Sequence, residues 1–355
     1  MVVEAGIKGK AAYRRHTSIT GKPFDKVMLR RIRCVMKSNA RVWPRTLGAV
    51  LALALGGCGR PAAPKSGTQS AATSVETVAV ASKPAASAKK EAAERYPLTG
   101  QITGIDAARK VLIVYHDEIK DYMPAMTMEF IVSPGDLAVA KVGQRIRADL
   151  IPSETGDFRL EKIWPDEKLA TAAVADAARG LREDTKTRGK NAYREVGETV
   201  PSFTLVDQEG RVIPGGHFRG KKVMMNFIFS RCPVATMCPA ATAKMMATQK
   251  LAKDAAVPNI EFVSITLDPV FDTPGVLKEY ASVRGIDTTN FSFLTGPDSA
   301  IRDLLTQFGV IAELEGDFLK HTLTTLLIDE RGKIMHRTDG SVWEPKDFVA
   351  KMKQP

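Results

Sequence analysis

The spacing of hydrophobic residues in this chain changes from one segment to the next. Between Tyr96 and Trp164, apolar and polar residues alternate in short runs separated by turn-forming residues, which predicts strands rather than helices. The expected strands are Leu98–Ile105, Lys110–His116, Met126–Val132, Gln144–Leu150 and Phe158–Ile163. Five short strands so close together predict a small barrel or sandwich over residues 95–165.

From Val200 onward, apolar strands alternate with helical patterns. Strands are expected at Lys222–Phe229, Ile260–Leu267, Phe291–Leu294, Thr324–Ile328 and Lys333–Arg337, and helices at Ala240–Ala256, Pro274–Arg284, Ser299–Phe308 and Pro345–Met352. Such alternation predicts a parallel βαβ section, and a glycine turn between the last two strands makes these two antiparallel. We therefore expect an α/β domain over residues 196–355, preceded by a helical, charged linker over residues 166–195.

The residues before the first expected strand are typical of an export signal and a tether. Basic residues precede an apolar run from Leu47 to Leu55, and Gly56, Gly57 and Cys58 follow it. This order is typical of a secretory signal, and the run is too short to span a bilayer. The four residues from Leu55 to Cys58 resemble a bacterial lipobox. This resemblance implies a lipid on Cys58 and an exported protein anchored on the periplasmic side of a membrane. Residues 58–94, rich in Ala, Ser, Pro and Lys, predict a disordered tether.

The charge distribution argues against a nucleic-acid partner. The chain has 355 residues and a formal net charge of +11. Twelve basic and two acidic residues lie within residues 1–57, so this leader and signal segment carries +10 and the remaining chain +1. A protein that binds nucleic acid needs its basic surface in the folded part of the chain. No nucleic-acid partner is therefore expected.

A histidine and several methionines suggest a first metal site. Met126 and Met128 lie two residues apart on an expected strand, so both side chains face the same side, and His116 ends the strand before it. Thioether sulfur with one imidazole suits Cu(I). The alternative is that these methionines only fill the core of the strand.

This segment resembles the CusF family of periplasmic Cu(I)-binding domains, whose signature is a histidine followed by an aromatic-Pro-x-Met-Thr-Met strand. The resemblance implies an OB-like barrel with His116, Met126 and Met128 as metal ligands. Met123 stands where the family has a tryptophan that covers the metal. We therefore expect Met123 to serve as a third thioether.

Two cysteines and a histidine suggest a second site. Cys232 and Cys238 follow an apolar strand, and Pro239 starts the next helix, whose N-terminus favours a thiolate at Cys238. His321 precedes a later strand, at the end where a thioredoxin-like fold would bring it to the cysteines. Two thiolates and an imidazole make a good copper site. The alternative is a structural disulfide, which is common in secreted proteins.

Residues 196–355 resemble the Sco/SenC family of thioredoxin-fold copper proteins. The matching segments are FTLVDQEGR, FIFSRCP, the CP at 238–239, VSITLDPVFDTPGVLKEYA, FSFLTG and HTLTTLLIDERGK. The resemblance implies Cys232, Cys238 and His321 as ligands of Cu(I), with Cu(II) as a second form at this site, and places Asp268 near them. The chain departs from the family in spacing its cysteines Cys-x5-Cys rather than Cys-x3-Cys.

These features favour a membrane-tethered copper chaperone with two Cu(I) sites. Its expected partner is a copper-receiving protein, a cytochrome c oxidase subunit during assembly of the oxidase copper centre. One alternative is a thiol–disulfide reductase in which Cys232 and Cys238 are the catalytic redox pair, in either order. Another is a periplasmic copper buffer that confers tolerance without delivery.

Overall fold

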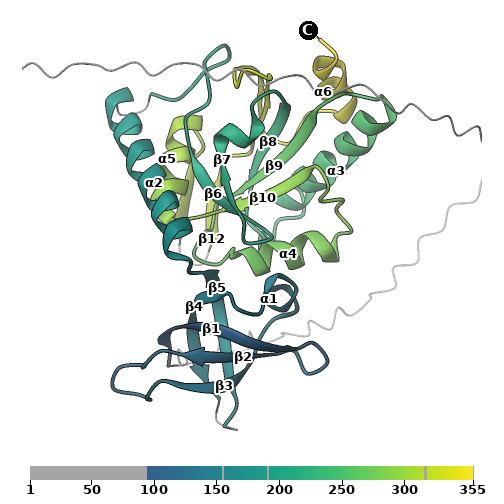
Figure 1. The fold of residues 1–355 in the computed structure, drawn as a ribbon. Coiled ribbons are helices and arrows are strands. Elements are labelled where there is room, and N and C mark those ends of the chain that lie inside the picture. Colours follow the sequence, from purple (N-terminus) through teal and green to yellow (C-terminus); the bar gives the residue numbers. More distant parts are fainter. Residues whose placement is uncertain (1–93, 154–155, 190–191, 316–317, 355) are drawn as a thin grey trace, which may run out of the picture. The chain divides into compact units, whose positions relative to one another are not determined.

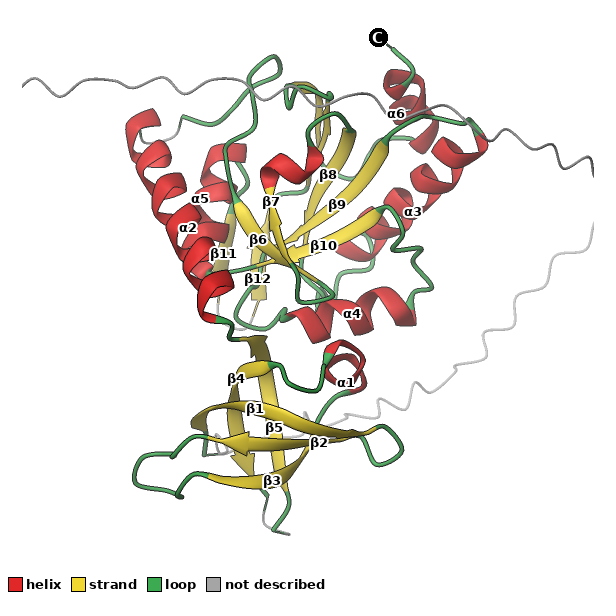
Figure 2. Cartoon of the chain, viewed as in Figure 1, coloured by secondary structure: helices red, strands yellow, loops and turns green. Residues whose placement is uncertain are grey.

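The computed structural model describes residues 94–153, 156–189, 192–315 and 318–354. These residues form a closed five-stranded barrel, a seven-stranded sheet flanked by helices, and a separate two-stranded hairpin (Figures 1 and 2). Among the described residues, no helix is both long and apolar enough to cross a membrane.

The barrel consists of β1 (Tyr96–Asp106), β2 (Val111–His116), β3 (Met126–Ile131), β4 (Arg145–Pro152) and β5 (Phe158–Pro165), with α1 (Pro134–Val139) between β3 and β4. The strands close in the order β1-β2-β3-β5-β4, and β4 pairs with β1. All five strands match the expected ranges to within two residues, because their alternating inward residues fill one small core. The expected barrel is thus confirmed.

The second sheet has the order β14-β13-β8-β9-β10-β6-β7. Its strands are β6 (Thr204–Asp207), β7 (Val212–Pro214), β8 (Lys222–Ile228), β9 (Ile260–Thr266), β10 (Phe291–Thr295), β13 (Thr324–Ile328) and β14 (Ile334–Asp339). Strands β8, β9 and β10 are parallel, whereas β13 is antiparallel to both β8 and β14. Every residue of β8 is buried, so this strand lies at the centre of the core. The expected order of parallel and antiparallel strands is confirmed.

Helices lie against this sheet. They are α2 (Lys168–Arg188), α3 (Cys238–Asp254), α4 (Pro274–Val283), α5 (Asp298–Phe308) and α6 (Pro345–Met352). Helix α3 packs on α6, and α5 packs on β8 through the rings of Phe308 and Phe227, whose centres are 5.6 Å apart. The pattern did not predict several short elements: α1, β6, β7, the 3₁₀ turn η1 (Gly215–Phe218) and the hairpin of β11 (Ala312–Glu315) with β12 (Phe318–His321). Such short segments show no measurable periodicity.

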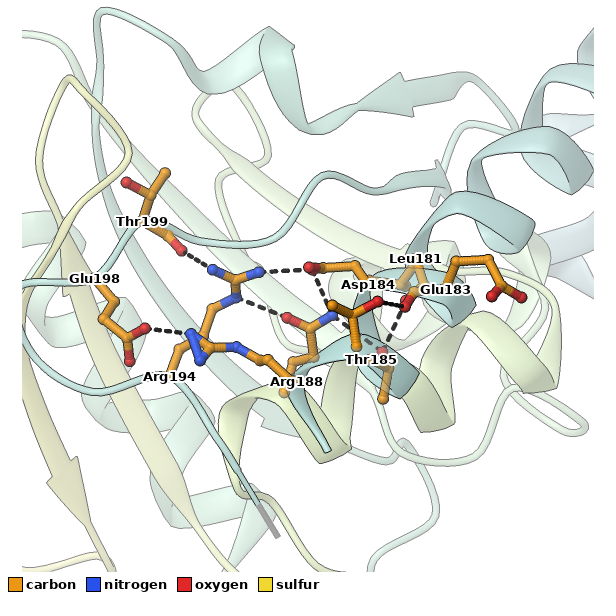
Figure 3. A network of polar contacts seen from close by, with 10 residues as sticks. Leu181, Glu183, Asp184, Thr185, Arg188, Arg194, Glu198 and Thr199 are labelled. Atoms are coloured by element: carbon orange, nitrogen blue, oxygen red, sulfur yellow. Dashed lines mark hydrogen bonds and ion pairs between the residues drawn. The ribbon is translucent and has the colours of Figure 1, made fainter. Parts of the chain in front are cut away.

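Helix α2, in the segment expected as a linker, is fastened to the sheet domain (Figure 3). The guanidinium of Arg194 donates to Asp184 of α2 at 2.6 Å, to Gln307 of α5 at 2.7 Å and to the Thr199 carbonyl at 2.7 Å. Gln307 donates in turn to Asp184 at 2.8 Å. Leu181 of α2 is buried in the main core beside these contacts. Helix α2 therefore packs as part of this domain.

Candidate copper sites

The structure brings two cysteines and one histidine together from three separate segments. Cys232 lies in the loop after β8, Cys238 is the first residue of α3, and His321 ends β12. One ligand atom from each residue lies within 4.8 Å of the others. Both thiols are free. The longer Cys-x5-Cys loop thus still places both sulfurs at one site.

The protonation of His321 is set by its hydrogen bonds. Its Nδ1 lies 3.2 Å from the Thr322 carbonyl, and its Nε2 lies 3.4 Å from Cys238 Sγ. Since a carbonyl only accepts, Nδ1 carries the proton and Nε2 presents its lone pair to the sulfur. Burial lowers the pKa of His321, so the ring is neutral at pH 7. Phe229 packs edge-on against this ring, with centres 5.4 Å apart. A neutral imidazole beside two thiols is a donor set that fits copper.

Asp268 does not belong to this group of ligand atoms. Its carboxylate accepts from Nε of Arg231 at 2.8 Å and pairs with the same guanidinium through Nη2 at 2.8 Å. The guanidinium also lies over the ring of Phe271, 4.6 Å from its centre. The carboxylate of Asp268 is therefore paired with the guanidinium of Arg231.

The two cysteines differ in burial. Cys238 is fully buried, whereas Cys232 is half-buried. Burial raises the pKa of the Cys238 thiol well above its usual range. The expected thiolate at Cys238 is therefore wrong for the metal-free protein, since burial outweighs the stabilisation from the helix N-terminus. Cys232 is the accessible thiol of the pair.

This difference predicts unequal alkylation. In metal-free reduced protein at pH 7.5, we expect iodoacetamide to modify Cys232 more than about tenfold faster than Cys238, because the thiolate fraction falls tenfold for each unit by which the pKa rises. Mass spectrometry of the two cysteine-containing peptides measures both rates. Unfolding in guanidinium is the control and should make the rates similar. Equal rates in the folded protein would contradict the assignment.

The barrel places a histidine opposite a methionine at one end. His116 of β2 pairs with Met126 of β3, and Met128 lies two residues further along β3, opposite Val114. His116 is fully buried, while Met126 is 42% exposed and Met128 is half-buried. Met123 packs against the same core from the loop before β3. The structure thus places His116, Met126 and Met128 together and Met123 close to their core.

His116 is oriented with one ring nitrogen free. Its Nδ1 lies 2.8 Å from the Asp117 carbonyl and therefore donates to it, so Nε2 carries the lone pair in the neutral form of the ring. This Nε2 is buried and has no hydrogen-bond partner among the residues that the structure describes. Unsatisfied buried polar atoms are rare in proteins, and a metal ion is one way to satisfy them. The residue set, an imidazole nitrogen with nearby thioethers, fits Cu(I).

Gly100 creates room for this histidine, although the pattern of residues did not single it out. It lies opposite His116 on β1, and a Cβ atom there would be 2.6 Å from the Tyr115 carbonyl oxygen and 2.8 Å from the His116 Cα. Any side chain would push β2 away. A glycine within an alternating strand is the only signal that marked the position in advance. The remaining predicted residue, Cys58, lies outside the described residues, as do the signal and the tether.

Comparison with known proteins gives two family matches. Residues 191–354 match the family model described as SCO1/SenC, and residues 95–165 match the one described as copper binding periplasmic protein CusF. A SCO2-like protein of Rickettsia conorii is 31% identical over 168 residues, which are 45% of this chain and 79% of the relative. A SCO1 protein homolog of Bacillus subtilis is 30% identical over 42% of this chain and 78% of its own length. A solved SCO1/SenC family lipoprotein from Bacillus anthracis is 28% identical, with a TM-score of 0.42 over 46% of this chain and 98% of that structure.

The SCO1/SenC match covers the region that contains the candidate cysteine and histidine site. The matched residues include the loop with both cysteines, the strand that ends before it, and His321. These two relatives from Rickettsia conorii and Bacillus subtilis are each covered over more than two thirds of their length, at 31% and 30% identity. The chain belongs to the SCO1/SenC family.

Proposed function

We propose that this protein is a copper chaperone that binds Cu(I) at two sites and delivers it to another protein. The proposal rests on one observation: the ligand atoms of Cys232, Cys238 and His321 all lie within 4.8 Å of one another. Two soft sulfurs and a neutral imidazole favour Cu(I) over Mg²⁺ or Ca²⁺, which prefer oxygen ligands. Copper is the cargo in this proposal.

The barrel supplies the second site of the proposal. The free Nε2 of His116 and the sulfurs of Met126 and Met128 bind the ion, and Met123 adds a third thioether. A thioether keeps its ligand character under conditions in which thiols form disulfides. The barrel therefore holds copper when the cysteine site is oxidised, and the cysteine site takes it up once reduced.

The recipient and the location complete the proposal. The recipient is a copper-receiving subunit of cytochrome c oxidase, which is the partner that the family resemblance implies. Lipid on Cys58 would keep the protein on the membrane that holds such a recipient. Support for the lipid comes from the sequence pattern before Cys58.

An anaerobic Cu(I) titration against a competing chelator tests the proposal. The full chain is used with Cys34→Ser and Cys58→Ser. Cys232 and Cys238 are then its only cysteines. We expect about two Cu(I) ions per chain in the reduced protein and about one after oxidation of the cysteine pair. If the reduced protein takes no Cu(I) from the chelator, at either site, the proposal is wrong.

A thiol–disulfide reductase remains a second candidate, favoured by the unequal burial of the cysteines. The half-buried Cys232 would attack a partner disulfide and form a mixed disulfide, and Cys238 would then displace the partner. The partner leaves with two thiols, and this chain keeps a Cys232–Cys238 disulfide. Stoichiometric reduction of a copper-ligand disulfide by the copper-free protein would favour this candidate, whereas no reduction would favour the chaperone.

A further inference from the structure

Asp272, in the loop between β9 and α4, is a completely buried carboxylate. Its Oδ2 accepts from the Ser230 amide at 3.1 Å and from the Thr266 hydroxyl at 2.6 Å, and its Oδ1 accepts from the Ser230 hydroxyl. None of the ion pairs among the described residues involves Asp272. Burial raises its pKa to about 6. A buried carboxylate without a cation is costly, so its hydrogen bonds are its main compensation.

These hydrogen bonds join three segments at the edge of the cysteine site. Ser230 lies two residues before Cys232, and Thr266 is the last residue of β9. Asp272 itself precedes Thr273, the residue that caps α4. Thr266 also accepts from the Asp268 amide at 2.9 Å. The buried carboxylate therefore fixes the start of the cysteine loop to the neighbouring strand and helix.

The other backbone hydrogen bonds that the structure describes for the cysteine loop are local. The Cys232 amide donates to the Phe229 carbonyl at 3.3 Å, and the Met237 amide donates to the Val234 carbonyl at 3.0 Å. Val234 at its centre is 43% exposed. Cys238 is held by α3 and by burial, whereas Cys232 depends on the residues immediately before it. Arg231 is attached through its side chain to Asp268, and Ser230, bound to Asp272 through both its amide and its hydroxyl, is the nearest residue whose backbone is fixed to another segment.

We propose that Asp272 is a positioning residue for the copper site, which holds Ser230 and thereby sets where the Cys232 sulfur lies relative to Cys238 and His321. The copper part of this inference rests on the proposed function. The positioning of Cys232 does not, because it also governs the reactivity of the metal-free thiol.

The chemistry of the side chain provides a matched pair of variants. In Asp272→Asn, the amide oxygen still accepts from the Ser230 amide and the Thr266 hydroxyl, and the amide nitrogen donates to the Ser230 hydroxyl after that hydroxyl rotates. Asp272→Ala removes every acceptor. Positioning by hydrogen bonds therefore predicts that asparagine rescues the defect of alanine.

Two measurements test the positioning role of Asp272 in the full chain. The parent protein for both carries Cys34→Ser, Cys58→Ser, Met126→Leu and Met128→Leu, so that only the cysteine site is left to bind copper. For Asp272→Ala we expect a Cu(I) affinity about 10- to 100-fold weaker, as for other groups that orient metal ligands. Asp272→Asn should stay within about threefold of the unchanged residue. In metal-free protein, alkylation of Cys232 should be several-fold faster for the alanine variant, because a loosened loop exposes the sulfur more often.

Asp303→Ala is the control for loss of a buried carboxylate. Asp303 is 6% exposed and accepts from Arg182 of α2 at 2.7 Å, away from the cysteine loop. This variant should lower stability without changing the affinity or the alkylation rate. If Asp272→Ala does not fold by circular dichroism, Ser230→Ala removes one of the three hydrogen bonds and should shift both readouts in the same direction by a smaller factor.

The outcomes separate the two proposals. Unchanged affinity and unchanged alkylation in Asp272→Ala would overturn the positioning role and leave the copper function standing. Equal defects in the asparagine and alanine variants would also overturn positioning by hydrogen bonds. No Cu(I) binding by the parent chain would overturn the copper function, while the alkylation rates would still decide the role of Asp272.

Discussion

Replacing Cys232 with serine is expected to remove one copper ion and leave the other, so that bound Cu(I) falls from about two ions per chain to about one. The hydroxyl of serine is a hard donor and replaces the only accessible sulfur of the site, while the barrel ligands lie in another part of the fold. An anaerobic titration against a competing chelator measures the change.

Cys238→Ser is the matched variant for the buried sulfur and should remove the same ion. Together, the two cysteine variants should lose no more copper than either alone, because both sulfurs serve one ion. Retention of two ions in Cys232→Ser would contradict a cysteine site, and loss of both ions would contradict two independent sites.

The second large effect is expected in the barrel. Changing Met126 and Met128 to leucine keeps most of their volume but removes both sulfurs, so we expect loss of the other ion at little cost to folding, less than about 1.5 kcal/mol for each change. Cu(I) stoichiometry and the free energy of unfolding are the two measurements. Double leucine replacement at Met245 and Met352, which are buried in the other core, is the control and should leave about two ions bound.

His116 offers an independent check on the barrel site. His116→Leu removes the unpartnered Nε2 without adding a polar atom, so copper should be lost without a large fall in stability. A barrel that keeps its ion after both the methionine and the histidine changes would contradict the site.

The strands and the candidate copper ligands were largely predictable because local signals determine them. Alternation along β1 to β5 reports which residues face the barrel core, so it also predicts that Met126 and Met128 share a face. The pairing of His116 with Met126 required the register of β2 and β3, which the pattern alone did not supply. The cysteines and His321 were recognised by residue type and by resemblance to a family.

The remaining features depend on contacts between distant segments. The pairing of Asp268 with Arg231 joins two loops, and the hydrogen bonds of Asp272 join three. The thiolate expected at Cys238 is wrong because the helix N-terminus is visible in the sequence but the depth of burial, which raises the pKa of the thiol, is not. The packing of α2 could not be predicted because only two of its residues, Val174 and Leu181, are buried against the rest of the fold.

For the proposed chaperone, the unequal burial of the two cysteines predicts a direction of copper transfer. An incoming thiol from a partner would meet Cys232 first, because Cys238 is buried in the core. Ligands would then exchange one at a time, with Cys232 the first to be displaced. Cys238 and His321 would retain the ion until the partner had supplied enough ligands of its own, so copper would not be released into solvent.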